Sequence, residues 1–258
     1  MDKSPKCRIL VIPDCHCKPR VSLDHLTWAG RAICEYRPDV VVNLGDFADM
    51  PSLSSYDKAG SKYFEGKRYK EDISVAKYGM ELLLEPLRTL QAQQKSNKHR
   101  VYTPRLVFCY GNHEDRITRA INNNPILEGT ISLGDLSYEK DWEVHEYLKP
   151  VFINGIGFSH YFPVGAMQRP AATSIAMVNK LHMSCVAGHK QGKEVSSGKR
   201  ADGTPITCII CGSYYQHDED YMPDNNYWRG LLVMHEVHDG AFDEMFLSLN
   251  YLRSKYSE

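Results

Sequence analysis

The chain has 258 residues, enough to bury a large core as one domain or as two small ones. Its 31 lysines and arginines almost balance its 32 aspartates and glutamates, so the formal net charge is −1. This balance argues against non-specific binding of polyanions as the main activity, because it predicts no overall basic surface. A negatively charged ligand would have to be attracted by a few local groups.

The sequence predicts a cytoplasmic protein with no membrane segment. Its first residues lack the charged-then-apolar pattern of a signal peptide, and no apolar run approaches the length of a membrane helix. Four of the eight cysteines, Cys7, Cys34, Cys109 and Cys185, lie in apolar runs. We expect buried, reduced thiols there, as in a reducing compartment.

The first predicted elements form a strand–helix–strand unit. Residues 7–13 (CRILVIP) are an apolar run of strand length that ends at its proline. Ser22 is placed to cap a helix that continues to about Tyr36. Residues 40–44 are apolar and β-branched, as expected for a strand that is buried on both faces. This order predicts two parallel strands joined by a right-handed crossover.

A long loop and a long helix are predicted next. Residues 50–70 mix cations with aromatic residues as single-strand binding surfaces do, but an ordinary surface loop is the simpler interpretation. Apolar residues recur at helical spacing over residues 73–90, where Pro86 is expected to kink or split the helix. Residues 91–100 are predicted to be a charged surface connection, and residues 105–110 the next buried strand.

The second half of the chain favours antiparallel strands. Residues 151–160 are predicted to form a hairpin around an Asn-Gly turn, and residues 231–249 a hairpin around an Asp-Gly turn. Between them we expect a helix over residues 171–181 and short strands at 185–187 and 207–211. The fold class is therefore α/β, with a βαβ unit followed by mostly antiparallel strands.

Five short blocks of acidic, amide and imidazole residues are spaced along the chain, and four of them directly follow a predicted strand. The blocks are Asp14-Cys15-His16, Gly45-Asp46-Phe47-Ala48-Asp49, Gly111-Asn112-His113-Glu114, His160 and Gly188-His189. Because open α/β sheets place their chemistry at the carboxyl ends of strands, we expect these blocks at one edge. Oxygen and imidazole donors from separate strands suit a pair of divalent cations, which predicts a metal-dependent hydrolase.

The donor atoms in these blocks can be assigned to metal binding. Asp14 and His16 lie two residues apart on extended backbone, so both side chains can point to the same side. The glycine before Asp46 allows a tight turn that brings the carboxylate inward, where its two oxygens can bridge two cations. Two cations about 3.5–4 Å apart would polarise a phosphoryl group and hold a bridging hydroxide for in-line attack. The remaining donors are the amide oxygen of Asn112 and the imidazole nitrogens of His160 and His189.

From residue 9 to about residue 213, the ordered blocks resemble the motifs of the calcineurin-like metallophosphoesterases, which include Mre11-type nucleases and purple acid phosphatases. A looser likeness is to uncharacterised phosphoesterases of bacteriophages. The resemblance implies a four-layer αββα sandwich of two mixed β-sheets flanked by helices. It also implies a single domain over residues 1–258, with a helical and loop insertion at about 50–104, and it suggests a homodimer.

By this resemblance the two metals share one carboxylate. The first metal is held by Asp14, His16 and Asp46, and the second by Asp46, Asn112, His160 and His189. The catalytic residues are then His113, Asp46 and Asn112. Of these, His113 would contact the phosphate and protonate the leaving oxygen, a function that suits an imidazole.

One position departs from the family pattern. The last motif of the family is Gly-His-x-His, whereas residues 188–191 of this chain read GHKQ. Gln191 can ligate the first metal through its amide oxygen, which favours Mn²⁺, or else Mg²⁺, over Zn²⁺ or Fe. The first of the two divalent cations would otherwise be bound weakly, bound only with substrate, or held by His182 or His217.

Three further residues have two interpretations each. Asp49 either orients a metal-bound histidine or caps the loop that follows it. Arg116 and Arg119 are three residues apart, so a helix would place them on one face. They are candidates for contact with a substrate phosphate, and the alternative is a solvated helix face.

The favoured substrate is a phosphodiester, in DNA or RNA. After Asp49 the chain continues Met50-Pro51, without the Arg-Gly typical of the protein serine/threonine phosphatase branch. A phosphomonoesterase acting on nucleotides or phosphoproteins is the first alternative. The second is a binding scaffold with weakened metal motifs, which Gln191 favours and the presence of His113 argues against.

Overall fold

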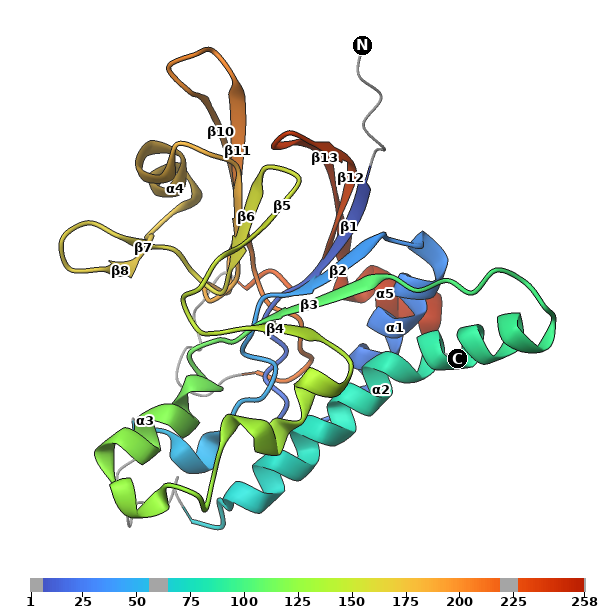
Figure 1. Cartoon of the computed structure of the whole chain (residues 1–258), viewed down its shortest axis with the longest axis vertical. Coiled ribbons are helices and arrows are strands. Elements are labelled where there is room, and N and C mark those ends of the chain that lie inside the picture. Colours follow the sequence, from blue (N-terminus) through green and yellow to red (C-terminus); the bar gives the residue numbers. More distant parts are fainter. Residues whose placement is uncertain (1–6, 56–64, 219–226, 258) are drawn as a thin grey trace.

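The computed structural model describes residues 7–55, 65–218 and 227–257 and contains two large β-sheets with helices on their outer sides (Figure 1). The first sheet has six strands in the order β13-β12-β1-β2-β3-β4. Strands β1 to β4 are parallel to one another, β12 is antiparallel to β1, and β13 is antiparallel to β12. The bounds are β1 Cys7–Ile12, β2 Val40–Asn43, β3 Arg105–Cys109, β4 Glu143–His145, β12 Gly230–His238 and β13 Ala241–Ser248.

The second sheet has five strands in the order β10-β11-β9-β6-β5. Its three central strands are parallel to one another, and the two outer strands are antiparallel to their neighbours. A short two-stranded sheet, β7 with β8, lies beside it. The bounds are β5 Val151–Ile153, β6 Ile156–Ser159, β7 Pro163–Val164, β8 Arg169–Pro170, β9 Cys185–Ala187, β10 Lys193–Lys199 and β11 Pro205–Cys211.

The helices divide between the two outer faces. Helices α1, α2 and α5 cover the first sheet, and α4 packs on the second (Figure 1). The α-helices are α1 Asp24–Tyr36, α2 Tyr69–Ser96, α3 Asp115–Asn123, α4 Ser174–Leu181 and α5 Leu249–Tyr256. Four short 3-10 helices are η1 Pro51–Leu53, η2 Pro125–Leu127, η3 Leu133–Leu136 and η4 Tyr138–Lys140. None of the helices in the described residues is long and apolar enough to cross a membrane.

Three separate apolar clusters establish that the protein has four layers. One fills the space between the first sheet and α1, α2 and α5, a second lies between the sheets, and a third lies under α4. Because successive side chains of a strand point to opposite faces, Leu10 of β1 faces the helices and Val11 faces the second sheet. Ile209 and Ile210 of β11 divide between the second and third clusters in the same way. The layer order confirms the predicted αββα sandwich.

The predicted cap of the first helix is displaced by one residue. Helix α1 begins at Asp24, and the residue in the cap position is Leu23, whose side chain makes no capping hydrogen bond. Ser22 still accepts a hydrogen bond from the backbone N–H of Asp24 and donates one to its carboxylate. The hydroxyl therefore pairs with the start of the helix from just outside it.

The long helix α2 is continuous through Pro86, so of the predicted kink or split the split is wrong. It also continues to Ser96, into the stretch 91–100 that was predicted to be a surface connection. Glutamine and lysine are good helix formers, and Gln91 and Gln94 in this part of α2 hydrogen-bond to the backbone of Tyr102. In the predicted loop over residues 50–70, η1 and the first turn of α2 are helical, and positions 56–64 lie outside the described residues.

Candidate metal centre

The candidate site lies where five strands of the two sheets end. Asp14, Asp46 and Asn112 follow β1, β2 and β3 of the first sheet. His160 and His189 follow the neighbouring parallel strands β6 and β9 of the second sheet. Parallel strands present their carboxyl ends at one edge, and here the two sheets present those edges to each other. The structure therefore brings together predicted donors that are far apart in the sequence.

Close backbone approaches make this convergence possible. A Cβ atom on Gly111 would lie 2.1 Å from Asp46 Oδ1, and one on Gly188 would lie 2.5 Å from Asp14 Oδ1. Only glycine leaves room for these carboxylates. The backbone of Asp46 and that of His189 are left-handed, with φ of 48° and 66°. Such strained conformations in residues other than glycine are concentrated at functional sites.

The donor atoms expected to hold the second metal surround His160. Its Nδ1 lies 2.9 Å from the backbone oxygen of Leu44, so Nδ1–H donates there and Nε2 faces the site. Around Nε2 lie Asn112 Oδ1 at 2.9 Å, His189 Nδ1 at 3.1 Å and Asp46 Oδ2 at 3.3 Å. Four donor side chains thus point at one small volume, which is the arrangement that a bound cation requires.

The donor atoms expected to hold the first metal share Asp46 with this group. His16 Nε2 is 3.8 Å from Asp46 Oδ2 and 4.0 Å from Asp14 Oδ2. Asp14 Oδ1 accepts a hydrogen bond from the backbone N–H of His189, whereas Oδ2 is buried and has no hydrogen-bond partner among the described residues. Burial raises the pKa of Asp14. A buried carboxylate oxygen without a partner is costly, and a cation would satisfy it.

For Asp46 and His160, neighbouring charges shift the pKa in the direction opposite to the shift that burial causes. Burial alone would raise the pKa of Asp46, but the nearby His113 and His160 hold it well below its usual range. Burial alone would lower the pKa of His160, but the charge and hydrogen bond of Asp46 raise it to about 9. Burial, followed by the charge of His160, lowers the pKa of His189 to about 4. Without a cation, a proton on His160 therefore occupies the centre of the donors.

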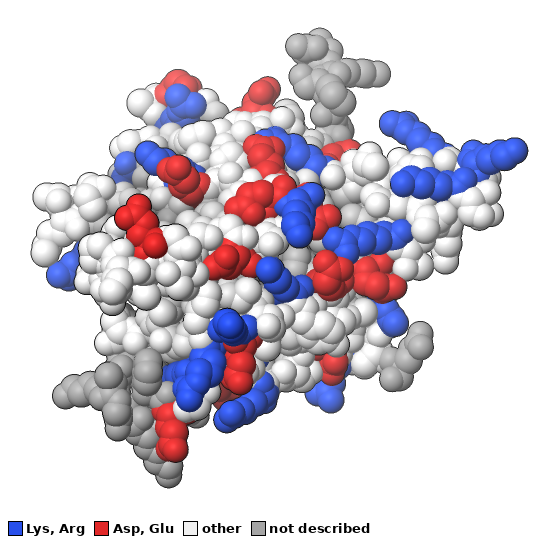
Figure 2. Space-filling model, turned by 60° about the horizontal axis from the view of Figure 1, so that its bottom comes forward, with Lys and Arg blue, Asp and Glu red and all other residues white. Residues whose placement is uncertain are grey.

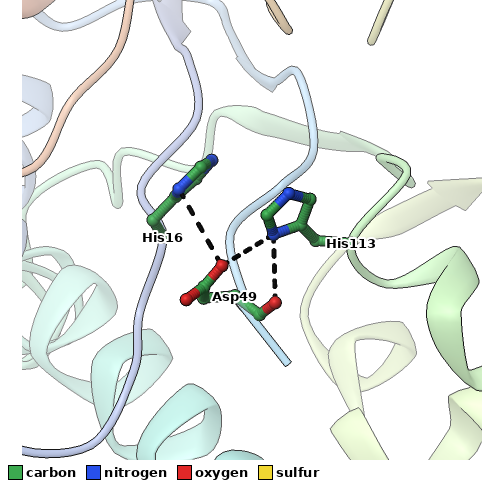
Figure 3. Close-up of side chains that lie close together, drawn as sticks. All are labelled: His16, Asp49 and His113. Atoms are coloured by element: carbon green, nitrogen blue, oxygen red, sulfur yellow. Dashed lines mark hydrogen bonds and ion pairs between the residues drawn. The ribbon is translucent and has the colours of Figure 1, made fainter. Parts of the chain in front are cut away.

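His113 and Asp49 form a tight pair beside these groups. Figure 3 shows Asp49 between the rings of His16 and His113. Asp49 Oδ1 is 2.7 Å from His113 Nδ1 and 3.9 Å from His16 Nδ1. Burial would raise the pKa of Asp49, but the hydrogen bond and charge of His113 lower it to about 2. Of the two interpretations of Asp49, this geometry favours the orientation of histidine side chains.

The two candidate arginines have different surroundings. Arg116 Nη2 is 3.1 Å from His113 Nε2, while its Nη1 donates to the backbone oxygens of Asp49 and Met50. Arg119 donates instead to the backbone oxygen of Asn112 and lies 3.3 Å from the carboxylate of Asp115. Its side chain is 49% exposed. The guanidinium of Arg116 therefore extends into the site, and that of Arg119 lies at its rim.

The sequence matches the family model described as calcineurin-like phosphoesterase over residues 7–225. The chain belongs to this family. Calcineurin-like phosphoesterases are metal-dependent hydrolases of phosphate esters that bind two divalent cations, as the sequence predicted. A search of curated proteins finds no match. Among solved structures, the phosphoesterase Yfce from E. coli is similar over 94% of this chain and 100% of its own, with 12% identity and a TM-score of 0.38. That likeness is too remote to support an argument about the site.

The donor set fits the two cations of a calcineurin-like phosphoesterase. In the described residues, two groups of converging ligand atoms contain Asp46, one with Asp14 and His16 and the other with His160 and His189, beside a third group of His16, Asp49 and His113. Within each group the atoms lie within 4.8 Å of one another. Asp46 belongs to the first two of these groups, as a bridging carboxylate must. Oxygen and imidazole donors in this mixture suit Mn²⁺, Zn²⁺ or Fe, and the oxygens also suit Mg²⁺.

Glu114 has a function in this site that sequence reasoning did not assign. It is fully buried, and its carboxylate accepts hydrogen bonds from the backbone N–H groups of Asp46, Ala48 and Gly111 at 2.8–2.9 Å. Burial and the charge of Asp46 raise the pKa of Glu114 to about 7. One side chain therefore ties the loop after β2 to the loop after β3. The only signal in the sequence was its place directly after His113.

The position of the missing family histidine is occupied by a hydrogen-bonded pair. Gln191 Oε1 accepts a hydrogen bond of 2.6 Å from the hydroxyl of Tyr215, whose ring stacks on His16. The ring of His217 also stacks on the ring of Tyr215, with centroids 4.6 Å apart. Neither His217 nor His182 belongs to the groups of converging ligand atoms in the described residues. Sequence reasoning missed Tyr215 altogether.

Proposed function

We propose that this calcineurin-like phosphoesterase uses two Mn²⁺ ions to hydrolyse phosphodiesters, and that its substrate is DNA or RNA. The observation that carries the proposal is the pair of donor groups that share Asp46 beside the His113–Asp49 pair. The first ion would be held by Asp14, His16, Asp46 and Gln191, and the second by Asp46, Asn112, His160 and His189. Two such cations supply a nucleophilic hydroxide at neutral pH and polarise the phosphoryl group.

The side chains around the donors supply the proton and the charge that the reaction needs. Asp49 holds Nδ1 of His113, so that Nε2 faces the donor groups 3.7 Å from Asp46 Oδ2. A proton on Nε2 would pass to the leaving oxygen, and the hydrogen bond between Nδ1 and Asp49 keeps the ring in this orientation. Arg116 contacts Nε2 in the absence of substrate. A substrate phosphate would draw the guanidinium to itself and leave Nε2 to the leaving group.

The distribution of charge supports local rather than extended recognition of the substrate. On the face drawn in Figure 2, basic and acidic side chains lie next to one another, and no continuous basic area spans it. A nucleic acid that crossed this face would meet no continuous basic area along its backbone. The absence of the Arg-Gly pair after Asp49 also separates the chain from phosphoprotein phosphatases. A monoesterase acting on nucleotides remains the alternative activity.

The test compares hydrolysis of bis-p-nitrophenyl phosphate and p-nitrophenyl phosphate, with and without Mn²⁺. Wild type should cleave the diester faster, and His113→Ala should lose this activity while elemental analysis finds its bound metal unchanged. Cleavage of the monoester alone would replace the diesterase by a monoesterase. An inert wild type that binds no metal would favour the scaffold instead.

A further inference from the structure

The replacement of the family histidine by Gln191 has a structural partner in Tyr215. Tyr215 is fully buried, and its hydroxyl donates to Gln191 Oε1 at 2.6 Å. Its ring stacks on that of His16, with centroids 5.0 Å apart and an angle of 23° between the planes. The side chain thus reaches from one donor of the first metal group to the residue that stands in place of the missing donor.

Backbone hydrogen bonds fix both members of this pair. The backbone N–H of Tyr214 donates to the backbone oxygen of Asp14 at 2.7 Å. Tyr215 is therefore the next residue after a backbone contact with a member of the first metal group. The backbone oxygen of Gln191 accepts from the N–H of Trp228 at 2.9 Å. The N–H of Ser213 donates to the backbone oxygen of Trp228 at 3.0 Å, so the segments that carry Tyr215 and Gln191 are connected through Trp228.

In this structure the amide of Gln191 turns its oxygen, not its NH₂ group, towards the Tyr215 hydroxyl. The amide has an oxygen at one end and an NH₂ group at the other, and only the oxygen can accept the proton of Tyr215. The hydrogen bond holds the oxygen end of the amide, which is the end that can ligate a cation. It also limits the rotation of a side chain that is otherwise flexible, which lowers the entropic cost of ligation. Phenylalanine at position 215 would lack this hydrogen bond and would not restrain the amide of Gln191.

We propose that Tyr215 is a positioning residue that makes Gln191 an oxygen ligand of the first metal site and directs that site towards Mn²⁺ or Mg²⁺. The inference rests on the two-metal site of the proposed function. It accounts for the loss of the family histidine as a change of ligand type rather than the loss of a site. Tyr215 itself contacts neither substrate nor metal in this proposal and acts through Gln191.

The experiment measures Mn²⁺ binding rather than activity, by the EPR signal of free Mn²⁺ during titration of the protein. Wild type should bind two ions, and Tyr215→Phe should weaken the first by about 10–100-fold, as loss of a partner behind a ligand does. Affinity for the second ion should stay unchanged. The matched control is Tyr214→Phe, since Tyr214 is equally buried and its hydroxyl donates at 2.7 Å to the backbone oxygen of His25.

Two further variants test whether Tyr215 acts through Gln191. Gln191→Leu should weaken the first site, and adding Tyr215→Phe to it should change little, because the two effects are coupled. Gln191→His should raise the affinity for Zn²⁺ relative to Mn²⁺. Thermal melting of each variant separates a loss of folding from a loss of metal.

The outcomes distinguish this inference from the proposed function. Two Mn²⁺ ions bound equally well by wild type and Tyr215→Phe would overturn the positioning of Gln191 and leave the two-metal site intact. An equal loss in Tyr214→Phe would also overturn it, because general packing would then explain the effect. A wild type that binds fewer than two ions would overturn both proposals.

Discussion

Arg116 and Arg119 lie one turn apart on α3, but their guanidinium groups have different partners. Arg116 reaches His113, while Arg119 pairs with Asp115 at the surface. We expect Arg116→Ala to lower kcat/KM for a diester by about 10²-fold, as loss of one donor to a developing oxyanion does. Arg119→Ala should cost about fivefold or less, because exposed ion pairs contribute about 1 kcal/mol or less.

Steady-state kinetics on bis-p-nitrophenyl phosphate measures both effects, with bound metal quantified in each variant. Arg119→Ala is the internal control, since it removes the same charge three residues along the same helix. Equal losses in the two variants would mean that long-range charge attracts the substrate and that Arg116 has no special position.

His160 predicts how metal binding depends on pH. The pKa of His160 is raised to about 9, so its ring is protonated at pH 7 when no cation is bound. A cation needs the neutral ring, so binding should release about one proton, and the affinity should rise about tenfold per pH unit. His189 should release none, because its pKa is lowered to about 4.

Isothermal titration with Mn²⁺ in buffers of different ionisation enthalpy at pH 7 counts the released protons. The same shift affects stability without metal. Since the folded pKa of His160 is raised from 6.5 to about 9, its contribution is fully present below 6.5 and is lost as the pH rises through about 9. Binding of Mn²⁺ without proton release at pH 7 would show that the cation does not replace a proton on His160.

The candidate metal donors could be selected from local signals in the sequence, but the residues that support them could not. Each donor follows an apolar strand or a glycine, and both signals are local in the sequence. Glu114 is different, because its partners are backbone N–H groups of Asp46 and Ala48, more than 60 residues away in the chain. Tyr215 likewise acquires its importance only from contact with Gln191. Such functions depend on tertiary contacts that no pattern in one segment encodes.

At the scale of elements, α1 and α2 approach each other closely at Gly30. A Cβ atom at Gly30 would lie 2.3 Å from the backbone oxygen of Leu83 and 2.8 Å from Cγ of Pro86. Gly30→Ala would gain about 1 kcal/mol of helix propensity. The clash with a backbone atom should outweigh this gain, because overpacking costs about 1–3 kcal/mol. We expect a net loss of stability in urea unfolding.

Gly134→Ala is the matched control for this helix contact. The nearest atom to a Cβ at Gly134 is Ser132 Oγ at 3.4 Å, an ordinary contact distance. A stabilised Gly30→Ala variant would show that α1 can move away from α2 at little cost.

Elements with a buried face were easier to predict than elements at an edge. Strands β1 and β2 are continuous apolar runs because both of their faces are covered. Strand β10 is polar and lies at the edge of the second sheet, so only its pairing with β11 defines it. Helix α5 follows the last strand without an intervening loop, and the hairpin pattern before it concealed its start.

At the scale of the whole molecule, the packing of the layers sets the distance between the two sheets. The order of the blocks predicted which donors belong together, and the family match supports a two-metal hydrolase. The contact between Asp46 of the first sheet and His160 of the second depends on how the layers stack. The single domain over residues 1–258, the homodimer and the cytoplasmic location stay predictions.

Because the donors come from both sheets, metal binding should stabilise the folded molecule as a whole. A cation that binds only the folded state adds about 2.7 kcal/mol when its concentration is 100 times the dissociation constant. It would also relieve the cost of burying Asp14 Oδ2 without a partner. We expect Mn²⁺ to raise the Tm and EDTA to reverse the rise. Asp46→Asn should abolish most of it, because Asp46 belongs to both donor groups. His113→Ala should keep the rise, since His113 is not among the proposed ligands. A Tm that does not respond to Mn²⁺ in wild type would contradict metal binding between the sheets.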